Sequence, residues 1–238
     1  MPLKKPMGIE STSAQGAKIY HGFSRKVSPE EFEAAIQMSL DKVDGFSPFL
    51  NEIEVVPGDC FFIPANTIHA IGPGCLILEV MEPTDFTISP EYWCGSYRLS
   101  DEEMYLNLDK DTAISVFNFD SYGRESLEAN RLQPTITEQA DNITRESIVG
   151  PHITDCFSLN RITAMGGIAA LKAAPAIYVV TNGAGMLQGE NYSKSLKRGD
   201  YFFCLLKPTK DFQSPRMIWK YMNACRRRQR LSSPISRK

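Results

Sequence analysis

The stretch GDCFFIPANTIHAIG, residues 58–72, holds the residue with the clearest chemical potential. His69 is one of three histidines in 238 residues, and it follows a turn pattern built from Gly58, Pro64 and Asn66. Gly58 allows the turn into a strand, Pro64 ends that strand, and Asn66 tolerates a left-handed turn conformation. An imidazole held at such a hairpin can bind a divalent metal. His69 is therefore a candidate metal ligand, and a turn histidine satisfied by the backbone is the alternative.

Glu79 is the second residue of chemical interest, because it interrupts the apolar run CLILEVM. An ionised carboxylate inside a buried strand is costly unless it is paired or functional. Glu79 is therefore a candidate acid/base group, and a salt bridge across the sheet is the alternative. The other two histidines, His21 and His152, stand outside any ligand-spaced motif. We expect them at the surface or at a strand edge.

The elements around these residues are mostly short strands. Apolar runs broken by Gly and Pro predict strands at 17–23, 52–56, 60–63, 75–82, 157–164, 176–181 and 201–205. Ser28 as N-cap and Pro29 at the first helical position predict a helix over 28–43. Ser100 begins a helical insertion at 100–118. Short strands at close spacing favour an all-β sandwich or barrel over a parallel α/β sheet.

Two segments look alike, Pro57-Gly-Asp-Cys-Phe-Phe and Arg198-Gly-Asp-Tyr-Phe-Phe, and both follow a strand pattern. This weak internal repeat suggests two related β units. Between them, the polar stretch 128–150 is poor in large apolar residues, which predicts a linker or an edge segment. The expected divisions are a first β domain at 1–127, a linker at 128–150, a second β unit at 151–212 and a basic tail at 213–238.

Composition limits the class of protein. A hydrophobic share of 42% is enough for a core, and the net charge of −2 does not favour nucleic acid or an anionic membrane as a partner. No apolar run approaches the ~20 residues of a membrane span. The six cysteines stand singly and the N-terminus lacks an apolar leader core. We therefore expect reduced thiols in a cytoplasmic protein.

The residues around His69 resemble the second half-motif of a cupin barrel, with Asn66 in place of the motif's second glycine. The longer stretch GDCFFIPANTIHAIGPGCLILEVMEPTDFT resembles type I mannose-6-phosphate isomerases in their short bacterial form. So do AKIYHGF upstream and FSLNRI, APAIYVVTNGAGMLQG and LKRGDYFF downstream. The resemblance covers residues 16–206. It implies an all-β, double-stranded β-helix (cupin, jelly-roll) fold with a small helical insertion and a second, smaller cupin unit without metal ligands.

That family interconverts mannose 6-phosphate and fructose 6-phosphate with Zn²⁺, so the resemblance implies an aldose–ketose isomerase whose partner is a sugar phosphate. It implies His69 as a zinc ligand, Glu79 as a catalytic acid/base group and Asp85 as a substrate-binding residue. Ser89 stands where many relatives have an active-site arginine, and Arg98 is the candidate catalytic replacement. We expect a monomer or homodimer.

The chain departs from the family before residue 17. The family's other zinc ligands, a Gln-x-His pair and a Glu, precede the strand equivalent to AKIYHGF, and here only Glu10 offers a carboxylate there. Catalytic zinc usually takes three protein ligands. We therefore expect a fragment that lacks part of the metal site. A non-catalytic carbohydrate-binding or regulatory cupin is the alternative, and an Fe(II) oxygenase, which needs a second histidine and a carboxylate, ranks last.

Overall fold

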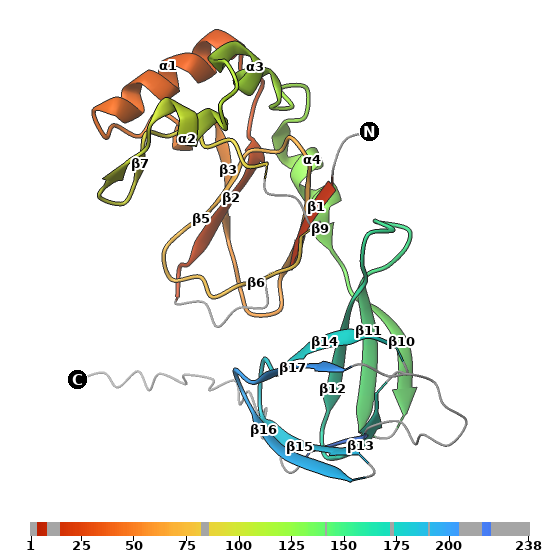
Figure 1. The fold of residues 1–238 in the computed structure, drawn as a ribbon. Helices are drawn as coiled ribbons and strands as arrows, with labels where there is room; N and C mark the ends of the chain where they lie inside the picture. The colour runs from red at the N-terminus through yellow and green to blue at the C-terminus, as the bar shows by residue number, and fades with distance from the viewer. Residues whose placement is uncertain are drawn as a thin grey trace, which may run out of the picture. The chain divides into compact units, whose positions relative to one another are not determined.

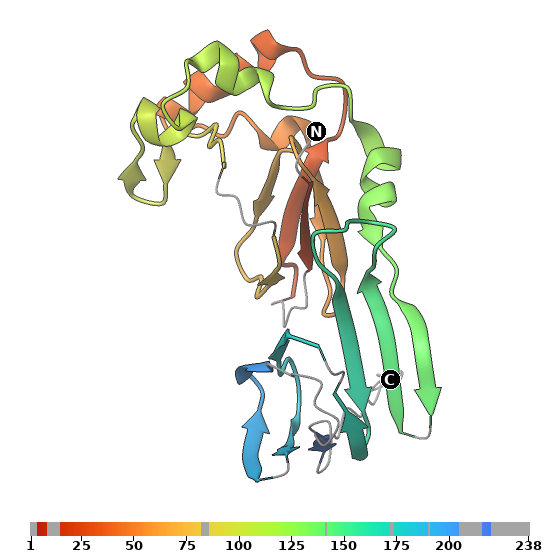
Figure 2. The same ribbon diagram turned by 45° about the vertical axis from the view of Figure 1, so that its right-hand side comes forward.

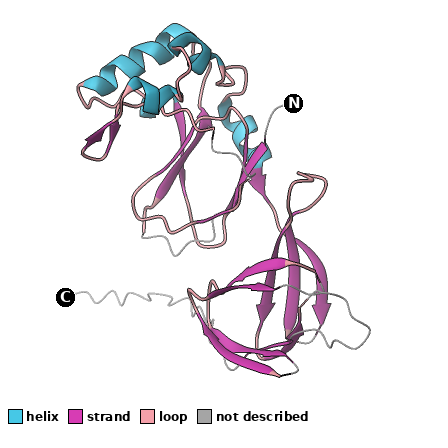
Figure 3. Ribbon diagram, in the orientation of Figure 1, coloured by secondary structure: helices cyan, strands magenta, loops and turns pink. Residues whose placement is uncertain are grey.

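The computed structural model describes residues 4–8, 15–81, 86–140, 142–171, 174–189, 191–204 and 216–219. The chain forms two compact units (Figure 1). Unit 1 contains Met1–Pro134 and Ile148–Leu159, and unit 2 contains Thr135–Ser147 and Asn160–Lys238. The chain therefore passes between the units three times. Within the described residues, all helices belong to unit 1 and unit 2 is built from strands (Figure 3).

Unit 1 is built on two antiparallel sheets. One has the strand order β3-β2-β5 and the other the order β6-β1-β4-β9. The bounds are β1 Lys4–Gly8, β2 Lys18–Phe23, β3 Leu50–Glu54, β4 Cys60–Pro64, β5 His69–Ile71, β6 Leu78–Glu79 and β9 Arg131–Leu132. A separate hairpin is formed by β7 (Trp93–Cys94) and β8 (Tyr97–Arg98).

A hydrophobic core joins these two sheets. Its buried members are Ala17, Ile19, Ile53, Val55, Phe61, Ile63 and Leu127. On β2, Ile19, His21 and Phe23 are buried while the residues between them are half-buried, so one face of the strand points inward. Burying each large apolar side chain of this kind contributes about 1.5–3 kcal/mol. The core therefore fixes which face of β2 lines the interior.

The helices of unit 1 are α1 Pro29–Leu40, α2 Asp101–Tyr105, α3 Lys110–Ser115 and α4 Gly123–Asn130, with a 3-10 turn η1 at Ser47–Phe49. The predicted starts are confirmed. Ser28 accepts a hydrogen bond from the Glu31 backbone N–H at 3.2 Å, and Pro29 takes the first helical position. Ser100 and Glu103 form a capping box at α2. Figure 1 shows α1, α2 and α3 gathered beyond one end of the β3-β2-β5 sheet.

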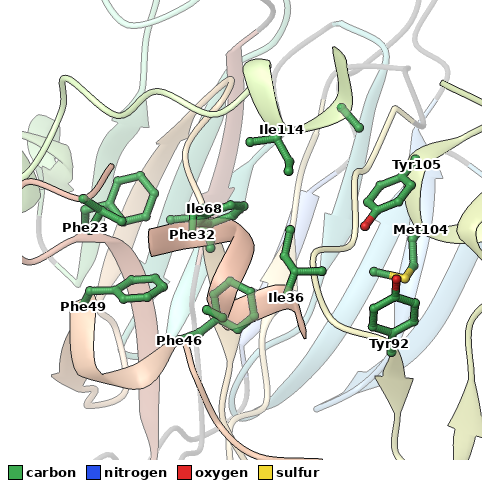
Figure 4. Close-up of a cluster of buried hydrophobic side chains, with 13 residues drawn as sticks. Phe23, Phe32, Ile36, Phe46, Phe49, Ile68, Tyr92, Met104, Tyr105 and Ile114 are labelled. Atoms are coloured by element: carbon green, nitrogen blue, oxygen red, sulfur yellow. The ribbon is translucent and has the colours of Figure 1, made fainter. Parts of the chain in front are cut away.

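An aromatic cluster packs the helices onto the strands (Figure 4). Phe32 of α1 is fully buried, and its ring centroid lies 4.8 Å from that of Phe117 and 5.4 Å from that of Phe46. Edge and tilted contacts of this kind add about 0.5–1.5 kcal/mol per pair to the gain from burial. Ile68, the residue before His69, belongs to the same cluster. The helical part of unit 1 therefore supports the hairpin that carries His69.

Unit 2 contains three small antiparallel sheets (Figure 2), with the orders β10-β11-β12, β13-β18-β15-β16 and β14-β17. The bounds are β10 Thr135–Ala140, β11 Ile143–Val149, β12 Leu159–Ala164, β13 Gly167–Ala170, β14 Ala176–Val179, β15 Ala184–Gly189, β16 Tyr192–Lys197, β17 Tyr201–Cys204 and β18 Arg216–Trp219. The core of this unit consists of Ala164, Leu171, Val180, Leu187 and Leu196. No helix in the described residues has the length and apolar character needed to cross a membrane.

Three expectations need correction. The stretch 128–150, expected to be a linker or an edge segment, is the end of α4 followed by β9, β10 and β11, and β10 lies at the edge of its sheet. Every residue of β10 is exposed, so this edge strand can be polar on both faces and gives no apolar signal. Residues 216–219 of the expected basic tail form β18, which pairs with β13 and β15. The strand expected at 75–82 is only β6, Leu78–Glu79.

The internal repeat has a structural counterpart in two identical turns. The Asp59 carboxylate accepts a hydrogen bond from the Val56 N–H at 3.0 Å, and the Asp59 N–H donates to the Val56 carbonyl at 3.1 Å. Asp200 makes the same two bonds with Lys197, at 2.8 and 3.0 Å. The glycine before each aspartate has a positive φ, 96° and 89°. Both turns lead directly into a strand, β4 in unit 1 and β17 in unit 2.

Candidate functional site

The turn that precedes His69 has the predicted left-handed residue. Asn66 has φ 70°, and its side-chain amide donates a hydrogen bond to the Val116 carbonyl. The Asn118 N–H donates to the Asn66 carbonyl at 2.9 Å. Asn66 therefore makes the turn and also fastens it to the chain that follows α3. A glycine at this position could supply the turn conformation but not the amide bond.

The His69 ring is half-buried and held in one tautomer. Its Nδ1 lies 2.9 Å from the Thr67 carbonyl oxygen. Because a carbonyl only accepts, Nδ1 must carry the proton and donate it, which leaves the lone pair on Nε2. A ring N–H anchored on a backbone carbonyl is the arrangement that orients metal-binding histidines. His69 therefore has the local chemistry of a metal ligand.

His21 is a neighbour of His69 that the sequence interpretation missed. In the antiparallel pairing of β2 with β5, His21 is the direct partner of His69. It is 2% exposed, so the expectation of a surface or strand-edge position is wrong. The alternation of Ile19, His21 and Phe23 was the signal that could have placed it on the inner face. The sequence shows this alternation, but it does not show that β5 is the strand that pairs with β2.

The environment of His21 favours the neutral ring. Nε2 lies 3.1 Å from the Phe62 carbonyl oxygen, so Nε2 carries the proton. Burial lowers the pKa of His21 below its ordinary value, and His69 nearby lowers it further. Hydrogen bonds to the Phe62 carbonyl and to its own backbone oppose this shift but are outweighed by burial.

Two glycines allow the close pairing that brings the histidines together. The Gly72 N–H donates to the Lys18 carbonyl at 2.9 Å, and a Cβ on Gly72 would lie 2.5 Å from that oxygen. Gly22 has φ +68°, and its N–H donates to the Ile68 carbonyl at 2.8 Å. Gly22 lies within the register shift of the β2–β3 ladder. The glycines thus hold β5 against β2 just before and just after His69.

The other predicted site residues lie elsewhere in the fold. Glu79 lies on β6, in the sheet that does not contain His69, and its side chain is exposed. The burial argument for Glu79 therefore does not hold. Arg98 is exposed on β8, with its guanidinium 5.7 Å from the ring centroid of Tyr92. Among the described residues, no hydrogen bond or ion pair joins Glu79 or Arg98 to His69. Asp85 lies outside the described residues.

Imidazole nitrogens are suitable ligands for a divalent metal, but the described residues offer fewer of them than a catalytic site needs. His69 and His21 offer two imidazoles of defined tautomer. Within the part of the chain that the structure describes, no group of three His, Cys, Asp or Glu side chains could hold a metal ion. Catalytic zinc usually takes three protein ligands. The described residues therefore do not complete a catalytic zinc site.

The fold and this hairpin define the class of protein to which the chain is similar. Its fold matches the mannose 6-phosphate isomerase of Bacillus subtilis with a TM-score of 0.66 and 22% identity, over 91% of this chain and 62% of that one. A structure from Archaeoglobus fulgidus, described as a putative mannosephosphate isomerase, matches with a TM-score of 0.59 and 18% identity over 91% of this chain and 57% of that one. The predicted all-β, cupin-type fold is confirmed.

Sequence comparison points to the same proteins. Mannose-6-phosphate isomerase ManA of Bacillus subtilis is 27% identical over 157 residues, 64% of this chain and 44% of that protein. The mannose-6-phosphate isomerase of Streptococcus mutans is 37% identical over 73 residues, 31% of this chain and 21% of that protein. No family model matches the chain. The predicted resemblance to mannose-6-phosphate isomerases is confirmed, and the chain spans less than half the length of the curated relatives it matches.

Proposed function

We propose that this protein is an aldose–ketose isomerase that interconverts mannose 6-phosphate and fructose 6-phosphate. The observation that carries the proposal is the likeness of fold over 91% of the chain to a mannose 6-phosphate isomerase. Sequence similarity over 157 residues to a curated protein of the same name supports it. The proposal includes zinc as the metal, a sugar phosphate as the partner, a monomer or homodimer as the assembly and the cytoplasm as the location.

The reaction moves a proton between C1 and C2 of the sugar, so it needs an acid/base group and a stabilised oxyanion. We assign His69 to the metal, because its Nε2 lone pair is available while Nδ1 is held by Thr67. Glu79 is the proposed proton carrier, Arg98 the proposed catalytic cation and Asp85 a proposed substrate contact. A bound zinc ion would supply Lewis acidity toward the sugar oxygens. The described residues alone do not complete the set of donors for that ion.

A non-catalytic cupin that binds carbohydrate or regulates another protein is the second candidate. The absence of any three-donor group among the described side chains favours it. Such a module would keep the fold and the sugar-phosphate preference but would not turn the substrate over. The two candidates therefore differ in turnover rather than in binding.

The test is an isomerase assay on the purified chain supplied with Zn²⁺, reading fructose 6-phosphate formed from mannose 6-phosphate. The proposal predicts turnover that falls by at least tenfold in His69→Ala. The matched control is His152→Ala, because His152 is exposed and has no proposed role. A folded wild-type chain with no turnover would contradict the isomerase. Sugar-phosphate binding by that inactive chain would then favour the non-catalytic module.

A further inference from the structure

We propose that the protein forms a homodimer through the outer face of the β14–β17 sheet in unit 2, where the same face of a second copy packs against it. The outer face consists of Ile177 and Val179 of β14 and of Tyr201 and Phe203 of β17. The inference rests on the proposed function for the assembly, of which it selects the homodimer, and not for the isomerase activity.

The strand register places the four side chains on one side of the sheet. Ile177 pairs directly with Phe203, and Val179 pairs with Tyr201, in the antiparallel ladder (Figure 1). Directly opposed residues of such a ladder point to the same side. Ile177 is 72% exposed and Phe203 60%, while Val179 is 40% exposed and Tyr201 75%. The outer face is therefore a continuous exposed apolar surface rather than a set of scattered residues.

The opposite face of the same sheet is already covered. The rings of Tyr178 and Phe202 are stacked, with centroids 5.1 Å apart, and both pack against the core of unit 2. Because successive side chains of a strand point to opposite faces, the burial of these two rings directs their neighbours outward. A two-stranded sheet needs packing against another layer to be stable, and the core supplies that layer on one side only.

The outer face differs from the other exposed strands of unit 2. β14 and β17 contain no charged residue. By contrast, Lys194 and Lys197 are exposed on β16, and Glu138 is exposed on β10. Charged side chains on solvent-facing strands prevent unwanted association with other chains. Their absence from β14 and β17 indicates that the outer face is covered in the working protein.

The area and composition of the outer face match the apolar centre of a dimer interface. An aromatic side chain buries about 150–250 Å², so the four exposed fractions correspond to an apolar area on the order of 500 Å². The largest apolar patch of a typical monomer measures about 300–600 Å² and is often functional. A stable interface buries about 800 Å² on each partner, and homodimer interfaces are about 65% apolar. The outer face thus supplies the apolar share of one such interface.

A second copy suits this face better than a transient partner of another kind. Transient interfaces are only about as apolar as the rest of a protein surface, whereas homodimer interfaces are richer in apolar area. A two-fold axis brings the same patch of both copies together, and an uncharged patch meets its equal without repulsion. Two sheets stacked in this way pack about 10 Å apart, with their facing side chains interdigitated.

The experiment is sedimentation velocity of the purified full chain over a hundredfold range of concentration. We expect the mass of two chains at the upper end of that range. Phe203→Lys and Ile177→Lys each place a charge in the apolar centre, so we expect each to raise the dissociation constant at least tenfold. The matched control is Ile136→Lys, because Ile136 is 56% exposed on β10 and lies outside the outer face. That variant should remain a dimer.

A conservative variant tests the same face should a lysine variant fail to fold. Val179→Thr keeps the β-branched shape, and we expect it to raise the dissociation constant severalfold. A wild-type chain that stays monomeric would overturn the inference, and reduced thermal stability of Phe203→Lys would then show that the protein's own chain covers the face. A dimer that survives both lysine variants would also overturn it. Turnover by a monomeric chain would leave the proposed isomerase intact.

Discussion

The side-chain amide of Asn66 donates a hydrogen bond to the carbonyl of Val116, which ties the turn before His69 to the end of α3. The two residues are far apart in the sequence and belong to different kinds of structure, a hairpin turn and a helical insertion. The bond shows that the insertion does more than cover the end of the sheet. It also holds the turn from which His69 projects.

Replacing Asn66 separates its two roles. Asn66→Gly keeps a residue suited to φ 70° but removes the bond to Val116, so we expect a loss of about 0.5–1.5 kcal/mol in the free energy of unfolding. Asn66→Ala also places a Cβ-bearing residue in the left-handed region and should lose about 1 kcal/mol more. Urea unfolding measures both. Equal stabilities for Asn66→Gly and wild type would show that the amide bond contributes nothing.

Gly72→Ala should push β5 away from β2. Its Cβ would lie 2.5 Å from the Lys18 carbonyl oxygen, a backbone atom that cannot turn aside. We expect a loss of about 1–3 kcal/mol in the free energy of unfolding, as in overpacked sites. Gly189→Ala is the control, because the closest atom there, in Tyr192, lies at 3.7 Å. If both alanine variants were equally stable, the close approach at Gly72 would not limit the pairing.

The two equivalent turns should differ in their sensitivity to alanine. The Asp59 carboxylate caps its turn and also binds the Arg131 guanidinium at 2.9 Å, with only 12% of the Asp59 side chain exposed. We expect Asp59→Ala to cost about 2–3 kcal/mol, since it leaves a half-buried cation without its partner. Asp200→Ala removes only the cap and should cost about 1 kcal/mol. Thermal unfolding of the two variants checks the order, and a larger loss in Asp200→Ala would refute it.

Stability should fall at mildly acidic pH because of His21. Burial lowers the pKa of His21 from its ordinary value of 6.5, so the unfolded chain binds this proton more tightly than the folded chain. The contribution is complete above pH 6.5 and is lost as the pH falls from 6.5 toward the folded-state pKa, by at most about 1.4 kcal/mol per pH unit. Carboxylates with lowered pKa values, such as Glu52, change the free energy of unfolding with pH only below about pH 4.5.

Unfolding in urea at pH 7.5, 6.5 and 5.5 measures this dependence. His21→Phe should lose the part of the slope between pH 6.5 and 5.5, because the titrating ring is gone. His152→Phe should keep it. If the pH dependence of His21→Phe matched that of wild type, another group would be responsible.

The helix starts and the His69 turn were predictable because their signals are local. Ser28, Pro29 and Ser100 act on backbone groups within one helical turn, and Asn66 responds to the conformation of its own residue. The position of His21 beside His69 could not be predicted from local signals. His21 reaches it through the β2–β5 register, and the sequence alone does not show which strands pair.

Polar strands and Glu79 mark the other limits of the sequence interpretation. β10 has no buried residue, so hydrophobic alternation could not reveal it. The apolar residues on both sides of Glu79 predicted a buried strand at this position. In the structure the strand has only two residues, and Glu79 is exposed. A run of apolar residues was therefore not enough to predict burial at this position.

The three passages of the chain between the units affect how the protein can be divided. Ile148 and Val149 pack with Cys60 in unit 1, although β10 and most of β11, which precede them, belong to unit 2. A protease that cut once after Pro134 would therefore leave a nicked molecule rather than two independent domains. An exchange of domains between homologous genes at that single point would likewise separate Cys60 from its partners. A single cut at this point therefore cannot separate the residues of unit 1 from those of unit 2.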